Sequence, residues 1–500
     1  MKTKIPAEIE DIARILSDAG FEAYLVGGSL RDMLLGVPPK DWDIATNAAP
    51  EETQKLFATY GGRTLEDHAT VYENSFGTVG IKTESEDESL KIVEVTTFRV
   101  EGKYTDKRHP DEVQFAKTIE EDLSRRDFTV NAIAFNLANH SLSKSHLVDP
   151  FNGMDDLQKK LLRTVGDPNK RFEEDALRLM RAVRFAAQLD FEIEHHTMNA
   201  VKENAGLLDM IAKERVRDEF SKLIMTPRAA MGIVMMEDMG LLKLVIPELR
   251  EGIACGQNKH HIYTVFDHNV RALNYTAEKE YSFVVRMASL LHDVGKPRTK
   301  GGDGPDSTFY NHEVVGARMT VKILDRLRFS KEHIEKISHL VRWHLFYYNV
   351  GEVTEAGVRR FLSRVGLENV DDLLKVREAD RIGSGVPKAF PYKLRHLLFM
   401  IDKVKNDPIS PKMVKLNGDE LMKELQLTPS RKVGYILSIL LEDVIQDPAK
   451  NEKEYLIARA KELNVFDDVE LSRMADKAKE HADEFEEGIE KEMKKKHKVA

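Results

Sequence analysis

Two aspartates one residue apart, Asp41 and Asp43, are the side chains whose type and spacing say most about the chemistry of this sequence. If the segment around Trp42 is a strand, both carboxylates point to one face, where a divalent cation would offset their repulsion. Upstream, Gly27 and Gly28 follow an apolar run and open a segment with helical character, so backbone N–H groups can approach phosphate oxygens. These residues predict Mg²⁺ and a phosphate-containing substrate, against the alternative of a turn beside two solvated aspartates.

The segment 25–43 resembles the first motif of the nucleotidyltransferases built on the polymerase-beta head. Within that superfamily it is similar to the class II group, which contains tRNA CCA-adding enzymes and bacterial poly(A) polymerases. Five matches in the family's order cover roughly the first 220 residues, so chance is a poor explanation. The other four matches lie at residues 125–134, at 149–153 with 161–166, at 174–186 and at 213–220.

The resemblance implies a reaction in which a terminal hydroxyl attacks the α-phosphate of a nucleoside triphosphate, with two metal ions at the attacking and leaving oxygens. Asp41 and Asp43 are the expected catalytic Mg²⁺ ligands. A third carboxylate is usual in this superfamily, and Glu94 has an alternating position in the strand-like stretch 91–99. The alternative for Glu94 is an exposed charge on an edge strand.

Further nucleotide-binding residues follow from the same motifs. A guanidinium fork matches phosphate oxygens, so Arg31 and Arg126 are candidates for the triphosphate. By resemblance, Asp127 and Asn131 fall near the ribose hydroxyls.

Base selection is expected at Glu174-Asp175-x-x-Arg178. Asp175 and Arg178 are three apart on a predicted helix and should share one face. A carboxylate accepts from the exocyclic amine of cytosine or adenine and a guanidinium donates to ring acceptors, so the pair can imitate a complementary base. The open alternative is an intrahelical salt bridge. Arg181 and Arg184 continue the nucleotide-binding set on the same helix.

The second half of the chain carries histidines and aspartates in the order His, His-Asp, Asp, which resembles the HD-domain metal phosphohydrolases. Side chains from separate helices can hold a divalent transition metal or Mg²⁺ and leave positions open for water and phosphate. An active and a vestigial HD site both stay open. The expected ligands are His268, His292, Asp293 and Asp380, with His312 and His344 as candidates for a second site or for binding phosphate.

These resemblances imply an α+β fold: a polymerase-beta-like head with a mixed sheet and helices, then an all-α neck and body, a helical HD domain and a helical C-terminal region. At 500 residues the chain should divide into several domains. Strands are expected near 22–27, 42–46, 76–82, 91–99 and 130–137. The expected domains are a head at 1–150, a nucleotide-selecting neck and RNA-binding body at 151–255, an HD domain at 257–400, and a helical module at 412–500 with an exposed, charged tail from Leu471.

Composition sets limits on the function. No apolar run is long enough to span a membrane, and the start of the sequence lacks an apolar signal core, so we expect a cytoplasmic protein without a membrane partner. The single cysteine, Cys255, excludes an internal disulfide. The net charge of −9 does not favour RNA binding by the chain as a whole, so any RNA contact depends on local basic clusters.

We therefore predict a template-independent tRNA nucleotidyltransferase that adds or repairs the 3′-terminal CCA of tRNA from CTP and ATP. Poly(A) polymerase and partial CC-adding or A-adding enzymes are the alternatives within the family. A flexible loop is thought to govern that division, and the segment 102–110 in its place favours full CCA addition. A hydrolase that uses its head mainly to bind RNA is the alternative of another class, which intact carboxylates oppose. The oligomeric state stays open.

Overall fold

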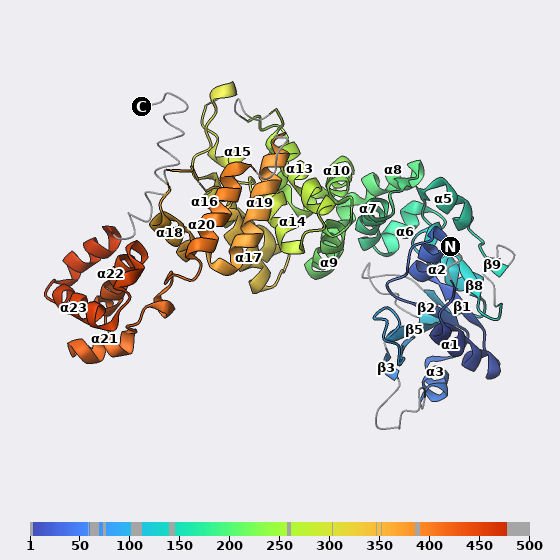
Figure 1. Ribbon diagram of the computed structural model, residues 1–500. Coiled ribbons are helices and arrows are strands. Elements are labelled where there is room, and N and C mark those ends of the chain that lie inside the picture. Colours follow the sequence, from blue (N-terminus) through green and yellow to red (C-terminus); the bar gives the residue numbers. More distant parts are fainter. Residues whose placement is uncertain are drawn as a thin grey trace. The chain divides into compact units, whose positions relative to one another are not determined.

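The computed structural model describes residues 4–58, 60, 70–73, 77–101, 113–139, 146–257, 262–302, 304–346, 348–351, 353–385 and 391–477. Its residues group into two compact units, one formed by 1–250 with 326–328 and the other by 251–325 with 329–500 (Figure 1). The boundary expected near residue 256 lies close to this division. The finer domain limits given above stay predictions.

The head is built on a mixed sheet. Its strands are β1 (Ala23–Val26), β2 (Asp43–Thr46), β3 (Thr70–Glu73), β4 (Thr78–Lys82), β5 (Ile92–Thr97), β8 (Ala134–Asn136) and β9 (Leu147–Val148). They are arranged in the order β3-β4-β5-β2-β1-β8-β9. Strand β1 is antiparallel to β2 and β8, whereas β2 is parallel to β5. The sheet therefore places the glycine turn after β1 beside the start of β2.

Four of the expected strands coincide with β1, β2, β4 and β5, but the strand expected at 130–137 is wrong in its first half. Residues Thr129–Asn131 form a 3-10 turn, and the strand begins only at Ala134. The side chain of Thr129 donates to Asp156 at 2.7 Å, which holds this turn against the following helix. Strands β6 (Arg99–Glu101) and β7 (Val113–Phe115) form a separate antiparallel pair.

Amphipathic helices cover the sheet. Helix α1 (Ala7–Asp18) buries Ile9, Ile12 and Leu16, which recur at helical spacing. Helix α2 (Gly27–Leu35) follows β1 directly. The other head helices are α3 (Pro50–Leu56) and α4 (Ile119–Ser124).

After the head the first unit is largely helical, as expected. Its helices are α5 (Gly153–Lys159), α6 (Pro168–Glu174), α7 (Leu177–Leu189), α8 (His195–Asn204), α9 (Lys213–Ile224), α10 (Ala229–Asp238), α11 (Leu242–Val245) and α12 (Pro247–Arg250). Helix α7 packs against α9 and α10. It buries Leu177, Met180 and Val183, which recur at helical spacing.

The second unit is a helical assembly in which α13 packs against α14 and α19. Its helices are α13 (Val265–Glu278), α14 (Phe283–Leu291), α15 (Lys296–Thr299), α16 (His312–Arg326), α17 (Lys331–Trp343), α18 (Glu355–Val365), α19 (Val370–Gly383), α20 (Tyr392–Val404), α21 (Gly418–Leu425), α22 (Arg431–Gln446) and α23 (Lys453–Leu463).

Near the C-terminus the expectation of an exposed helix from Leu471 is wrong for its first turns. Leu471 and Ala475 are buried in a core that includes Leu421, Leu440 and Leu456, because they recur at helical spacing on one apolar face. The remainder of that segment, 478–500, lies outside the described residues. Among the described helices, none has the length and apolar character needed to cross a bilayer.

Candidate active site and metal centre

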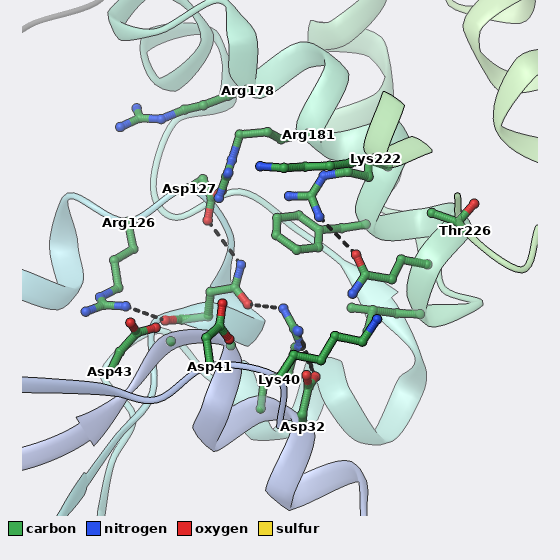
Figure 2. A pocket seen from close by; sticks show the side chains of 18 of the residues that line it. Asp32, Lys40, Asp41, Asp43, Arg126, Asp127, Arg178, Arg181, Lys222 and Thr226 are labelled. Atoms are coloured by element: carbon green, nitrogen blue, oxygen red, sulfur yellow. Dashed lines mark hydrogen bonds and ion pairs between the residues drawn. The ribbon is translucent and has the colours of Figure 1, made fainter. Parts of the chain in front are cut away.

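A cavity of about 1190 Å³ lies in the first unit, between the glycine turn and helices α7 and α9. Figure 2 shows Asp41, Asp43 and Arg126 at one side of it and Arg178, Arg181 and Lys222 across from them. All the predicted nucleotide-binding residues line this cavity, together with both aspartates of the pair. Glu94 is not among the lining residues.

The carboxylates gather at the start of β2. Asp43 is the first residue of that strand, and Asp41 precedes it rather than lying on it. Asp43 is in register with Glu94 on the parallel strand β5, so those two side chains are neighbours on one face of the sheet. Glu94 is exposed.

The glycine turn makes room for this cluster. Gly27 has φ +70°, which favours glycine, and a Cβ on it would lie 3.1 Å from Asp43 Oδ2 and 3.2 Å from Arg126 Nη1. A Cβ on Gly28 would lie 4.0 Å from Asp41 Oδ1. The start of α2 and both aspartates therefore meet at one point, as expected from the sequence.

Electrostatics at this point favour a cation. Burial and the nearby Asp41 and Glu94 carboxylates together raise the pKa of Asp43 to about 7, against the opposing charge of Arg126. A carboxylate that repels two others is stabilised in its ionised form by a divalent cation. Oxygen ligands of this kind suit Mg²⁺, so the donor set fits the expected metal.

Arg31, Asn131, Asp127 and Arg181 form one chain of contacts. Arg31 Nη1 donates to Asn131 Oδ1 at 2.8 Å, and Asn131 Nδ2 donates to Asp127 Oδ1 at 3.2 Å. Asp127 Oδ2 lies 2.6 Å from Arg181 Nη2. Burial alone would raise the pKa of Asp127, but the charges of Arg181 and Arg178 outweigh it and lower that pKa to about 2. Asp127 is therefore an ionised anchor for the arginines of α7.

The structure corrects the expected geometry of Asp175 and Arg178. Helix α6 ends at Glu174, Asp175 is extended with φ −138° and ψ 103°, and α7 begins at Leu177, so the two residues do not share a helix. Asp175 accepts from the Leu177 amide at 3.0 Å, which stabilises this break.

The partners of the two side chains also differ from the expectation. Asp175 accepts from Arg215 on α9 at 2.8 and 3.3 Å. Arg178 Nη1 lies 2.5 Å from Glu174 Oε2. Arg178 thus pairs with Glu174, and Asp175 and Arg178 still border the same cavity.

Sequence reasoning missed three residues that hold charged side chains of the cavity in place. Asp122 is 1% exposed and lies 2.7 Å from Arg125 Nη2 and 3.2 Å from Arg126 Nη2. Their spacing of three and four residues could have shown this. Arg215 and Glu219, which holds Arg184 at 2.6 Å, lie on α9, far along the chain from their partners, and no local signal links them.

In the second unit, the predicted HD residues come together. Ligand atoms of His268 (α13), His292 and Asp293 (after α14) and Asp380 (α19) all lie within 4.8 Å of one another. A second group joins Asp293 to His312 and His344 within the same limit. The two groups share Asp293.

The oxygens of Asp293 divide between the two groups. Oδ2 lies 3.1 Å from His268 Nε2 and 3.3 Å from His292 Nε2. Oδ1 lies 3.2 Å from His312 Nε2 and 3.6 Å from His344 Nε2.

Three of the four histidines are oriented as metal ligands are. Nδ1 of His292, His312 and His344 each lies 2.7 or 2.8 Å from the carbonyl oxygen three residues earlier. A carbonyl only accepts, so each Nδ1 donates, and Nε2 is the ring nitrogen left to face the cluster. This buried donor set of imidazoles and carboxylates fits a divalent transition metal.

A polymerase-beta-like head with clustered carboxylates at its glycine turn defines the class: the chain is a nucleotidyltransferase with an HD domain. Residues 23–163 match the poly A polymerase head domain, residues 190–253 the probable RNA and SrmB-binding site of polymerase A, and residues 265–382 the HD domain. The A-adding tRNA nucleotidyltransferase of Deinococcus radiodurans is 36% identical over 84% of this chain and 91% of its own length. The chain belongs to the family of tRNA nucleotidyltransferases.

Two CCA-adding enzymes are also similar. That of Ligilactobacillus salivarius is 33% identical over 92% of this chain and 98% of its own length. The crystal structure of the Bacillus stearothermophilus CCA-adding enzyme in complex with CTP has a TM-score of 0.66 at 26% identity, and the match covers 92% of this chain and 98% of that one.

Proposed function

We propose that this protein adds C, C and A in turn to the 3′ end of tRNA, with CTP and ATP as substrates and no template. One observation carries the proposal: Asp41 and Asp43 line one cavity with Asp175, and Arg178 and Arg181 lie across this cavity from the two aspartates. Support for the CCA product comes from the similar CCA-adding enzyme of Ligilactobacillus salivarius and from the similar Bacillus stearothermophilus enzyme, whose crystal structure is a complex with CTP.

Asp41, Asp43 and Glu94 are the residues that would hold Mg²⁺ in this proposal. When bound, two such ions stabilise charge on the attacking and leaving oxygens of a phosphoryl transfer. Arg31 and Arg126 bind and orient the triphosphate, because guanidinium groups match phosphate oxygens.

Base selection is assigned to Asp175 and Arg178. A carboxylate has about four lone-pair positions, so Asp175 can accept from Arg215 and from the exocyclic amine of cytosine or adenine together. Arg178 donates to ring acceptors of the same base. The keto groups of UTP and GTP would face Asp175 without a donor.

The test offers the purified full chain a tRNA that lacks its last three nucleotides, with Mg²⁺ and each labelled triphosphate alone and in combination. Products are resolved at single-nucleotide length. Addition of C, C and A followed by a stop supports the proposal, whereas a long A tail would show a poly(A) polymerase. Absence of any addition would overturn the assignment of the head.

A-adding activity is the second candidate, favoured by the 36% identity to the Deinococcus radiodurans enzyme. It predicts no addition to the shortened tRNA and one adenosine on a tRNA that ends in CC. The segment 102–110, which the sequence suggests as the governing loop, lies outside the described residues. The tRNA assay therefore decides between the two products.

We also propose that the HD residues form a metal-dependent phosphohydrolase site with two divalent cations. His268, His292, Asp293 and Asp380 would hold one, and Asp293, His312 and His344 the other, so this proposal takes the second group as a metal site and not as a phosphate site. Two cations that share a carboxylate suit hydrolysis of phosphate esters.

The prediction of a cytoplasmic protein belongs to the proposal of nucleotide addition, since tRNA and free triphosphates are the proposed substrates.

A further inference from the structure

One aromatic ring in the cavity wall has three guanidinium groups around it. Phe185 on α7 is 6% exposed, and its ring centroid lies 4.0 Å from Cζ of Arg184, 5.1 Å from Cζ of Arg181 and 5.3 Å from Cζ of Arg31. Cations within about 6 Å of a ring centroid are attracted to its negative face, and the attraction grows as water is removed. The ring of Phe128 meets that of Phe185 at 5.7 Å and 79°, which restricts its rotation.

Each of these guanidinium groups also pairs with a carboxylate, so their mutual repulsion is offset. The nearest N–O distances are 2.7 Å for Arg31 and Asp32, 2.6 Å for Arg181 and Asp127, and 2.6 Å for Arg184 and Glu219. The carboxylates come from three different parts of the chain. What the three arginines have in common is the ring of Phe185.

The arginines come from two elements that are far apart in sequence. Arg31 belongs to α2 of the head, whereas Arg181 and Arg184 belong to α7. All three line the cavity that holds Asp41 and Asp43. The ring of Phe185, which contacts all three, therefore sets the distance between Arg31 of the head and the two arginines of α7.

We propose that Phe185 is a positioning residue for nucleotide addition: its ring sets the spacing of Arg31, Arg181 and Arg184, so that they meet the substrate's phosphates as a preformed set. This inference rests on the proposed nucleotide addition. Preformed charges cost little reorganisation on binding, so the ring acts on substrate affinity more than on the chemical step. A leucine of similar apolar character could fill the space but has no negative face.

The experiment replaces Phe185 in the full chain by 4-fluoro-, 3,5-difluoro- and 3,4,5-trifluorophenylalanine, which weaken the negative face of the ring while changing its size little. We expect the KM for CTP to rise at each step, to about 10-fold in total, while kcat stays within about 2-fold. Phe185→Leu should raise the KM as much as the most fluorinated ring does. Phe185→Tyr should keep the KM of the unaltered protein.

Phe191 supplies the matched control, since it is 4% exposed and does not line the cavity. The same fluorinated residues at position 191 should leave the KM unchanged. A flat KM along the series at 185, with or without a lower unfolding temperature, would reduce Phe185 to a packing role and overturn the inference. Failure of the unaltered protein to add nucleotides would instead overturn the proposed function.

Discussion

Asp43 on β2 and Glu94 on β5 are partners in the parallel register of the head sheet, although helix α3 and strands β3 and β4 lie between them in the sequence. Their carboxylates repel each other, and Asp41 adds to the repulsion on Asp43. A partly buried carboxylate in this situation costs stability unless a cation accompanies it. The three carboxylates therefore lower the stability of the metal-free protein and favour the binding of a cation.

Asp43→Asn keeps the shape of the side chain and removes its charge. We expect nucleotide addition to fall about 1,000-fold, because a lost metal ligand costs several kcal/mol of transition-state stabilisation. In metal-free buffer the unfolding temperature should rise, since the repulsion is gone. Single-turnover addition and thermal unfolding with and without Mg²⁺ are the measurements.

Glu94→Gln separates the two interpretations of that residue. If Glu94 is a metal ligand, this change lowers nucleotide addition by about 10- to 100-fold, and Mg²⁺ raises the unfolding temperature of the variant less than that of the unaltered protein. Unaltered addition would restore the interpretation of Glu94 as an exposed strand charge. His292→Ala changes a residue outside this cavity, so it should leave nucleotide addition unchanged and serves as the control variant.

Arg215→Ala tests how Asp175 is held. The bidentate contact fixes the carboxylate that is proposed to accept from the base, so its loss should lower the preference for CTP over UTP about 10-fold. Arg178→Ala should lower the same preference and slow incorporation of CTP. The measurement is kcat/KM for each triphosphate at saturating tRNA.

Arg217→Ala is the matched control for this test. Arg217 lies on the same helix, pairs with Asp218 and does not line the cavity. Equal nucleotide preference in the Arg215 variant and the unaltered protein would show that Asp175 needs no such support.

The failure to predict the Asp175–Arg215 contact has a physical reason. Helical periodicity is a local pattern. It predicts one continuous helix through Asp175 because the residues on both sides favour helix. The break there depends on the Leu177 amide and on an arginine 40 positions later in the chain. Only the packing of α7 on α9 brings Arg215 close, and no spacing in one sequence encodes that.

The grouping of the head carboxylates and of the HD residues was predictable for the opposite reason. Asp41 and Asp43, like His292 and Asp293, occur as close pairs within motifs, so the sequence itself places them together. Glu94 required the additional step of pairing β2 with β5. The predicted residues of the HD site lie on different helices, yet the order of the motif was enough to name them.

Asp127→Asn should show a stability effect that depends on pH. The pKa of Asp127 is lowered to about 2 from an ordinary 3.8, so its ionised form adds about 2 kcal/mol above pH 4, and this is lost as pH falls toward 2. The difference in unfolding free energy between variant and unaltered protein should therefore shrink by about half from pH 6 to pH 3.

Urea titrations of the full chain at the two pH values measure this difference in the transition that the variant shifts. Asp11→Asn is the control, because its ion pair with Arg14 is exposed and contributes little at either pH. A difference that stays constant down to pH 3 would mean that Asp127 is not an ionised anchor.

The shared position of Asp293 leads to a prediction about metal content. In an Asp41→Asn, Asp43→Asn background, which removes binding at the head, the chain should retain two equivalents of Mn²⁺ after gel filtration. His312→Ala and His344→Ala should each reduce this to one equivalent, and Asp293→Ala should remove both, since each of its oxygens faces a different group. Elemental analysis gives the stoichiometry directly.

His339→Ala is the matched histidine control for that series. Nε2 of His339 donates to the Val365 carbonyl at 2.7 Å, and this residue belongs to neither ligand group. Its metal content should equal that of the parent. If the parent retains only one equivalent and His312→Ala keeps it, the second group does not bind metal; if His312→Ala loses that one equivalent, the six side chains serve a single ion, and Asp293 does not bridge two.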